Sequence, residues 1–143
     1  MLRMPSRRFA RVLLYVWVAP TSAVGVCAGL VALSTGGRMQ MRCGAIEIYG
    51  GLVRRWSRRF GFVAVTLGHV ILGVDAMTLE HVRDHEQAHV RQAEVWGPFF
   101  IPVYLLAGLW VWSRGGRAYY DNWFERDARR AEDNARRTRD RYA

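Results

Sequence analysis

The chain has 143 residues, a length that fits one small domain. Hydrophobic residues make up 51% of it, and much of this share sits in two apolar runs, while the rest is strongly polar and the net charge is +9. This uneven distribution argues against a uniform globule and favours a membrane protein with a small polar body. Cys27 lies inside the first apolar run and Cys43 beyond it, so we expect two free thiols.

The first apolar run extends from Val12 to Leu33 without a charge and is interrupted only by Pro20-Thr21-Ser22. It is long enough to cross a bilayer as a helix. A cleaved signal peptide is the alternative, but the run is longer than the usual apolar core and no clear small-x-small site ends it. We therefore expect a basic segment and a retained transmembrane helix over residues 1–35, followed by one domain over residues 36–143. Arginines on both sides of the run leave the membrane face of that domain open.

Residues 44–74 are expected to form a small β-sheet. Ala45–Tyr49 is a short apolar stretch that ends at two glycines, and residues 61–73 are rich in strand-forming residues, with Gly68-His69 in the middle of one or two strands. Four arginines surround Trp56 between these stretches, at positions 54, 55, 58 and 59. We interpret this segment as a loop in water or against lipid headgroups, in preference to a nucleic-acid contact.

The next predicted element is a helix with clear signals at both ends. Asp75 or Thr78 can cap its start, and Gly97-Pro98 stops it after Trp96.

Within this helix, residues 85–89 read His-Glu-Gln-Ala-His, the HExxH signature of zinc hydrolases. Residues four apart lie on one face of a helix, so His85 and His89 can reach one cation, and Glu86 can act on a water held there. His81 continues the four-residue spacing but lies about 12 Å from His89 along the axis, too far to share that cation. Two ordinary histidines on a helix are the simpler alternative.

The second apolar run, Pro98–Trp112, has two prolines and aromatic residues at both ends. It is short for a full span and suits a segment at the membrane interface or partly embedded in it, which we place at residues 98–113. A turn rich in glycine and arginine follows. Residues 118–142 are then expected to form a charged helix, with Asp121 or Asn122 as its cap.

A catalytic zinc needs a third protein ligand, and Glu125 in the charged helix is the best candidate. A carboxylate early in a helix is stabilised by the helix dipole, although a plain surface glutamate is the alternative. If the second apolar run crossed the bilayer straight, Glu125 would lie about 30 Å from the histidines. That run must therefore re-enter, lie at the interface or tilt, or else Glu125 is not a ligand. Weaker ligand candidates are Asp121, Asp127 and Glu132.

An HExxH helix followed by a later glutamate resembles the gluzincin metallopeptidases. The chain looks more closely like small bacterial membrane proteins that share His-Glu-x-x-His-Val-Arg-Gln, Trp-Gly-Pro-Phe-Phe-Ile-Pro and Tyr-x-Asp-Asn-x-Phe-Glu-Arg-x-Ala, over about residues 61–130. The resemblance implies zinc ligands His85, His89 and Glu125, with Glu86 as the general base. It also implies that Gly68–Gly73 is an edge strand that pairs with an extended peptide substrate.

One position departs from the gluzincin pattern. Many gluzincins carry an aspartate four residues after the ligand glutamate, where it orients a zinc-bound histidine, and this chain has Arg129 there. Asp121 and Asp127 are candidates for the missing orienting group. Candidates for a group that stabilises the transition state are His69, Tyr119 and Tyr120.

These inferences predict an α+β fold and a zinc metallopeptidase anchored in the bacterial inner membrane, with membrane lipid and a peptide or protein substrate as its partners. In this reaction Glu86 takes a proton from a metal-activated water and passes it to the leaving amine. The alternative is a non-catalytic membrane-anchored binding or scaffold protein, whose structural or vestigial metal site gains a further group from His69 or His81. We expect no specific nucleic-acid partner, since the arginine-rich tail lacks a binding motif.

Overall fold

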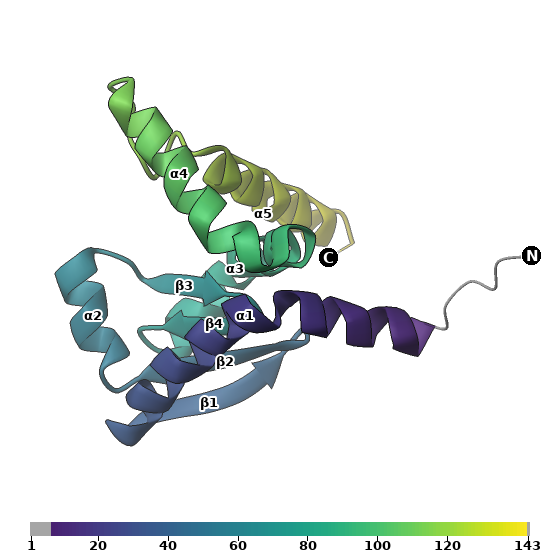
Figure 1. The fold of residues 1–143 in the computed structure, drawn as a ribbon, viewed down its shortest axis with the longest axis vertical. Helices are drawn as coiled ribbons and strands as arrows, with labels where there is room; N and C mark the ends of the chain where they lie inside the picture. The colour runs from purple at the N-terminus through teal and green to yellow at the C-terminus, as the bar shows by residue number, and fades with distance from the viewer. Residues whose placement is uncertain (1–6, 143) are drawn as a thin grey trace, which may run out of the picture.

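The computed structural model describes residues 7–142, which form a four-stranded sheet with helices on both of its faces (Figure 1). The predicted α+β class is confirmed. The elements in chain order are α1 (Arg7–Ser34), β1 (Gly37–Arg42), β2 (Ala45–Gly50), α2 (Val53–Phe60), β3 (Ala64–Leu67), β4 (Val70–Gly73), α3 (Ala76–Trp96), the 3-10 helix η1 (Gly97–Phe99), α4 (Phe100–Ser113) and α5 (Trp123–Tyr142).

The sheet has the strand order β1-β2-β4-β3. β1 pairs with β2 and β3 pairs with β4 in antiparallel hairpins, while β2 and β4 run parallel. The expectation that Gly68–Gly73 forms an edge strand is therefore wrong, because β4 lies between β2 and β3. Gly68 has a φ of 68° and makes the tight turn that folds the chain back, so that Leu67 pairs with Val70 and β3 takes the edge position.

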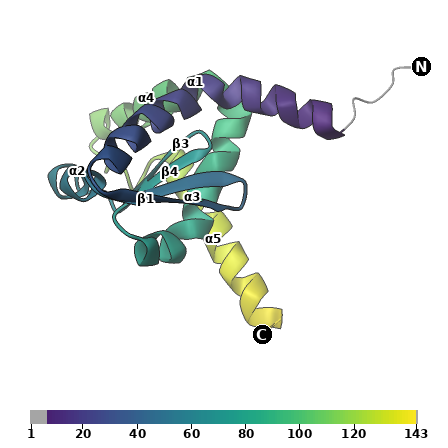
Figure 2. The same cartoon turned by 90° about the horizontal axis from the view of Figure 1, so that it is seen from below.

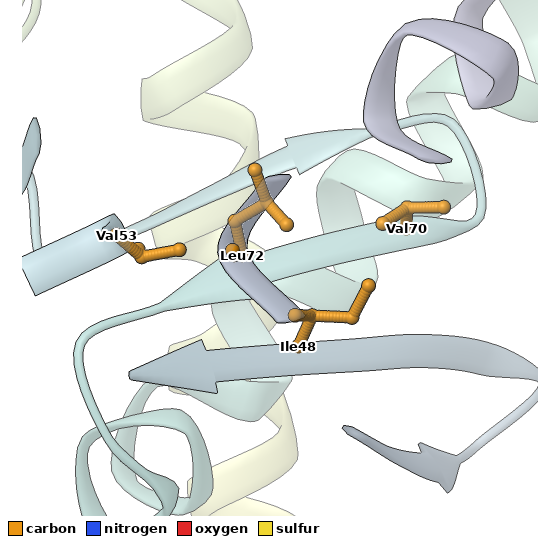
Figure 3. Close-up of a cluster of buried hydrophobic side chains, with 5 residues drawn as sticks. Ile48, Val53, Val70 and Leu72 are labelled. Atoms are coloured by element: carbon orange, nitrogen blue, oxygen red, sulfur yellow. The ribbon is translucent and has the colours of Figure 1, made fainter. Parts of the chain in front are cut away.

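α1 packs closely along one face of the sheet. A side chain at Gly25 would place its Cβ 2.7 Å from that of Val70, and one at Gly29 would lie 2.3 Å from Ile48. These glycines let the helix backbone approach the strands. Figure 3 shows the core beneath the helix, formed by Ile48, Val53, Val70 and Leu72 together with Ala32. Residues on both sides of the predicted boundary at residue 35 thus share one hydrophobic core, and the boundary itself stays a prediction.

α3 covers the opposite face of the sheet. Successive residues of a strand point to opposite faces, so Val70 and Leu72 of β4 face α1 while Ile71 packs with Leu79 and Val90 of α3. β4 is consequently buried on both sides.

A buried ion pair joins α3 to the sheet. The Glu47 side chain on β2 is fully buried, and Arg83 donates from Nε to its Oε1 at 2.9 Å. Gln40 on β1 donates to Oε2 at 2.6 Å, so both carboxylate oxygens of Glu47 have partners. This pairing offsets the cost of burying the charge.

The predicted ends of α3 are confirmed. Asp75 is the N-cap, and its carboxylate accepts a hydrogen bond from the Thr78 amide at 2.8 Å. The helix ends at Gly97, whose φ is 53° and whose missing side chain leaves room for the Trp17 indole of α1. Thr21 of α1 donates to the Gly97 carbonyl, which fixes the turn between α3 and α4 against α1.

Two other segments differ from the sequence prediction. The arginine-rich segment expected as a loop forms the helix α2, because Val53 and Trp56 lie three apart and pack on the core, while arginine itself is a good helix former. α5 begins at Trp123 instead of residue 118, and Asn122 is its cap, since its Oδ1 accepts from the Phe124 amide at 3.1 Å. Both cysteines are free, as predicted, and both are exposed.

Two helical stretches, Ala10–Ser34 and Ala76–Ser113, are long and apolar enough to cross a membrane. The second comprises α3, η1 and α4, and its most apolar part is α4. Figure 2 shows α1 and α4 on one side of the molecule, with the sheet and α3 beneath them and the C-terminal end of α5 pointing away.

Candidate metal centre

Three side chains from two helices converge on one point. His85 Nε2 of α3 lies 3.2 Å from Oε2 of Glu125 on α5, and His89 Nε2 lies 3.2 Å from Oε1 of the same carboxylate. The two imidazole Nε2 atoms are 3.2 Å apart. In the described part of the chain these residues form a group that could hold a metal ion, with ligand atoms within 4.8 Å of one another. The residues before and after the second apolar run therefore do meet.

Tight packing between α3 and α5 brings the distant glutamate to the histidines. Ala93 of α3 and Phe124 of α5 are fully buried and share one cluster with Phe100 of α4. Asn122 donates to the Tyr104 carbonyl at 3.1 Å, so α4 fixes the start of α5. The segment after α4 returns the chain to α3, which places Glu125 opposite the HExxH motif (Figure 1).

A hydrogen-bond chain fixes the tautomer of His89. Gln92 donates from Nε2 to the Phe124 carbonyl at 3.0 Å and to Asp127 Oδ2 at 2.9 Å. Its Oε1 therefore faces His89 Nδ1, at 2.8 Å, and must accept a hydrogen bond from it. A proton on Nδ1 leaves the Nε2 lone pair of neutral His89 directed at His85 and Glu125, which is the tautomer that binds a metal.

A second carboxylate lies beside Nδ1 of His85, the ring nitrogen that does not face Glu125. This nitrogen lies 3.5 Å from Oε2 of Glu132, one of the weaker ligand candidates, which sits two turns further along α5. Glu132 therefore places a negative charge beside the His85 ring, but it makes no hydrogen bond to Nδ1 of the kind that Gln92 makes with His89.

The Glu125 carboxylate is buried and charged. Burial alone would raise its pKa, but the adjacent imidazoles of His85 and His89 outweigh burial and hold the pKa well below its usual range. Tyr104 donates to Oε1 at 2.6 Å, whereas Oε2 is buried without a hydrogen-bond partner among the described residues. An unpartnered carboxylate oxygen beside two imidazole lone pairs is the donor set that a divalent cation satisfies.

Glu86 lies beside this group and is held from the sheet. Its side chain is buried, and Thr66 of β3 donates to its Oε2 at 2.6 Å. Burial raises the pKa of Glu86 above its usual range, against the opposing effects of His89, Thr66 and His85. A carboxylate with a raised pKa is the kind of group that enzymes use as a proton acceptor.

A cavity of about 290 Å³ opens next to the group and gives it room for a ligand. One wall is the edge strand β3 (Ala64–Leu67), and Phe100, Tyr104 and Leu105 of α4 form another. Glu86, His89 and Glu125 also line this cavity. Two of the three predicted metal ligands, His89 and Glu125, and the predicted base therefore face one shared space.

Of the other predicted site residues, some line the cavity and some lie outside it. Tyr119 lines the cavity, whereas exposed Tyr120 packs on the Tyr119 ring and lies near Arg117 and Arg129. Asp127 reaches His89 only through Gln92. Asp121 instead accepts hydrogen bonds from Arg117 outside the group.

His69 and His81 are placed apart from the three converging residues. His69 lies in the turn between β3 and β4, where its Nε2 is 3.1 Å from Glu94 and its ring packs on Tyr15. His81 is exposed on the first half of α3. Arg129, which replaces the expected aspartate, binds the Tyr120 carbonyl and lies 3.9 Å from Glu125.

Sequence reasoning did not identify Gln92, Tyr104 or Thr66. Gln92 follows His89 by three residues, and this spacing on a helix was a signal that the two side chains share a face. Thr66 and Tyr104 reach the site from a strand and from another helix, so only the tertiary packing reveals them.

Replacing Gln92 with alanine is expected to weaken metal binding by about 10–100-fold, because His89 loses the acceptor that fixes its ring and tautomer. Competition with a chromogenic chelator measures this affinity. Arg91→Ala is the matched control, since Arg91 is exposed on the same helix and is expected to leave metal affinity unchanged. Equal affinities of the Gln92 and Arg91 variants would contradict the orienting role.

No protein-family model, curated protein or solved structure matches this chain. Functional inference therefore depends on the geometry of the metal-binding group and the cavity beside it.

Proposed function

We propose that this protein is a membrane-associated zinc metallopeptidase, and we expect it in the bacterial inner membrane. The observation that carries the proposal is the contact of one buried carboxylate, Glu125, with both imidazoles of the HExxH helix. Two imidazoles and a carboxylate are a ligand set of catalytic zinc, which keeps its fourth position for water or substrate. The neighbouring cavity supplies the space that such an open position needs.

His85, His89 and Glu125 are the residues that would hold the zinc. When bound, zinc supplies Lewis-acid chemistry: it lowers the pKa of a water toward 7 and polarises a substrate carbonyl. We assign Glu86 to accept the proton of the attacking water and to deliver it to the leaving amine. Thr66 holds the Glu86 carboxylate toward the cavity, so the base is oriented before substrate arrives.

The substrate in this proposal lies along β3. Among residues 7–142 the outer edge of this strand pairs with no other strand, and it forms a wall of the cavity, so its backbone groups can bind an extended peptide. Tyr119 places a phenol group at the same cavity and is our candidate for a donor to the developing oxyanion, whereas the Tyr104 hydroxyl donates to Glu125.

A binding or scaffold role with a closed four-ligand metal site has less support. The further group in that alternative was His69 or His81, and the first faces Glu94 while the second is exposed. Neither belongs to the group of three in the described residues.

The proposal is tested by zinc analysis and peptide hydrolysis on the full chain in mild detergent. We expect bound zinc, hydrolysis of an unstructured fluorogenic protein substrate, loss of activity after dialysis against a chelator, and recovery with added zinc. Glu86→Gln should keep its zinc and lose turnover by about 10²–10⁴-fold, since it removes general-base catalysis. Hydrolysis that survives chelation, or that persists in Glu86→Gln, would refute the proposal.

A further inference from the structure

The face of α1 that points away from the sheet is apolar from Val12 to Leu33. The buried side of the helix is a stripe in which Val18 and Thr21 pack against α3 and the residues that follow it, and Gly25, Gly29 and Ala32 pack against the sheet. The opposite side exposes Val16 and Leu30, and no residue between positions 12 and 34 carries a charge. A folded protein in water rarely exposes so continuous an apolar surface without a partner for it.

α4 presents a second apolar face on the same side of the molecule. Its exposed side chains are large and hydrophobic, namely Leu105, Leu106, Leu109, Trp110 and Trp112. In Figure 1 the two helices are seen lengthwise, and in Figure 2, turned by 90°, both lie above the sheet and α3. The two helices therefore lie on the same side of the molecule.

The packing of α1 on the sheet argues against a bilayer crossing by this helix. The sheet lies beside it from Ser22, at the turn between β3 and β4, to Ala32, about 15 Å of its length at 1.5 Å per residue. A crossing helix would carry this part of the sheet into the hydrocarbon, including the open edge of β1 with Arg38 and Arg42. Open sheet edges are not tolerated at that depth because their backbone groups lose water without gaining partners.

Basic and aromatic residues border the two apolar faces. At the end of α4, Arg114 lies over the Trp110 ring at 4.1 Å. Near the end of α1, the helix α2 packs on the same core and exposes four arginines, at positions 54, 55, 58 and 59. Tryptophan and arginine at the border of an apolar surface match the headgroup region of a bilayer with anionic lipids.

We propose that the exposed faces of α1 and α4 together dock on an anionic bilayer, with both helices lying along the membrane plane instead of crossing it. Leu105 belongs to this surface, at 62% exposed, and also lines the cavity beside the metal-binding group. The bilayer would then lie next to the cavity. The identity of the substrate follows from this position and rests on the proposed function: the substrates are polypeptide segments at the membrane surface.

A depth measurement along α1 tests the orientation without using activity. Val16, Ala23 and Leu30 are exposed and seven residues apart, so they share one side of the helix. Each is replaced by cysteine in a chain that lacks Cys27 and Cys43, labelled with a fluorophore and mixed with phosphatidylcholine–phosphatidylglycerol vesicles carrying nitroxide lipids. We expect all three labels at the same shallow depth. A crossing helix would instead place position 23 about 10 Å deeper than the other two.

A label on native Cys43, in the Cys27→Ser variant, is the control, since Cys43 is exposed in the turn between β1 and β2. This label is expected to stay in water and to escape quenching by the nitroxide lipids. A label at position 23 that lies deeper than the labels at positions 16 and 30 would overturn the proposal. So would three labels that no lipid quenches, for instance because a second copy of the chain covers them. Neither result depends on peptide hydrolysis, so a failure here is distinct from a failure of the proposed function.

Discussion

Replacing Glu125 with glutamine is expected to remove bound zinc and turnover together while leaving the helices in place. The carboxylate is the one anionic member of the three-residue group, and a neutral amide of the same shape is a much weaker metal ligand. Loss of an outer-sphere partner already costs about 10–100-fold in metal affinity, so loss of a direct ligand should exceed about 100-fold. Zinc content after gel filtration, together with circular dichroism, measures both parts of this expectation.

Asp133→Asn is the matched control for this experiment. Asp133 lies on the same helix, is exposed, and changes the net charge by the same amount when it is replaced. It should retain zinc at the level of the native chain. If Glu125→Gln also kept its zinc, the assignment of the third ligand would be wrong, and the two imidazoles would need another partner.

The helix that carries the HExxH motif was predictable because its signals are local. An N-cap at Asp75, a four-residue histidine spacing and a Gly-Pro stop each depend on neighbouring residues, and the structure has the helix at Ala76–Trp96. The choice of Glu125 depended on an additional condition, that the chain returns after residues 98–113 to the helix that precedes them. The packing of α5 on α3 meets that condition in the structure.

The parts that sequence reasoning missed depend on partners distant in the chain. β1 exposes Met39 and Met41 and forms through its pairing with β2, so its own pattern gave no strand signal. The edge position of β3 follows from the order of strands in space, which no single strand encodes. α2 is different, since Val53, Trp56 and Phe60 already follow a helical spacing that the arginines around them obscured.

Replacing Phe124 with alanine is expected to lower the free energy of unfolding by about 3–5 kcal/mol. The ring is fully buried where three helices meet, and it packs on Trp96, Phe100 and Tyr104 at centroid distances of 5.8–5.9 Å. The free energy of unfolding of a whole domain is about 5–15 kcal/mol, so this one substitution would remove a large part of it. Chemical denaturation in mild detergent, followed by tryptophan fluorescence, measures the change.

Trp123→Ala is the control that distinguishes the effect of a buried cavity from the effect of removing an aromatic residue at this point of α5. Trp123 precedes Phe124 and stacks on its ring at 4.5 Å, but it is about half exposed, so its removal leaves no comparable cavity. The Phe124 variant should also bind zinc more weakly, because the Phe124 carbonyl holds Gln92 and Gln92 holds His89. Equal losses of stability in the two variants would mean that the junction of α3, α4 and α5 is not the tightly packed support that positions Glu125.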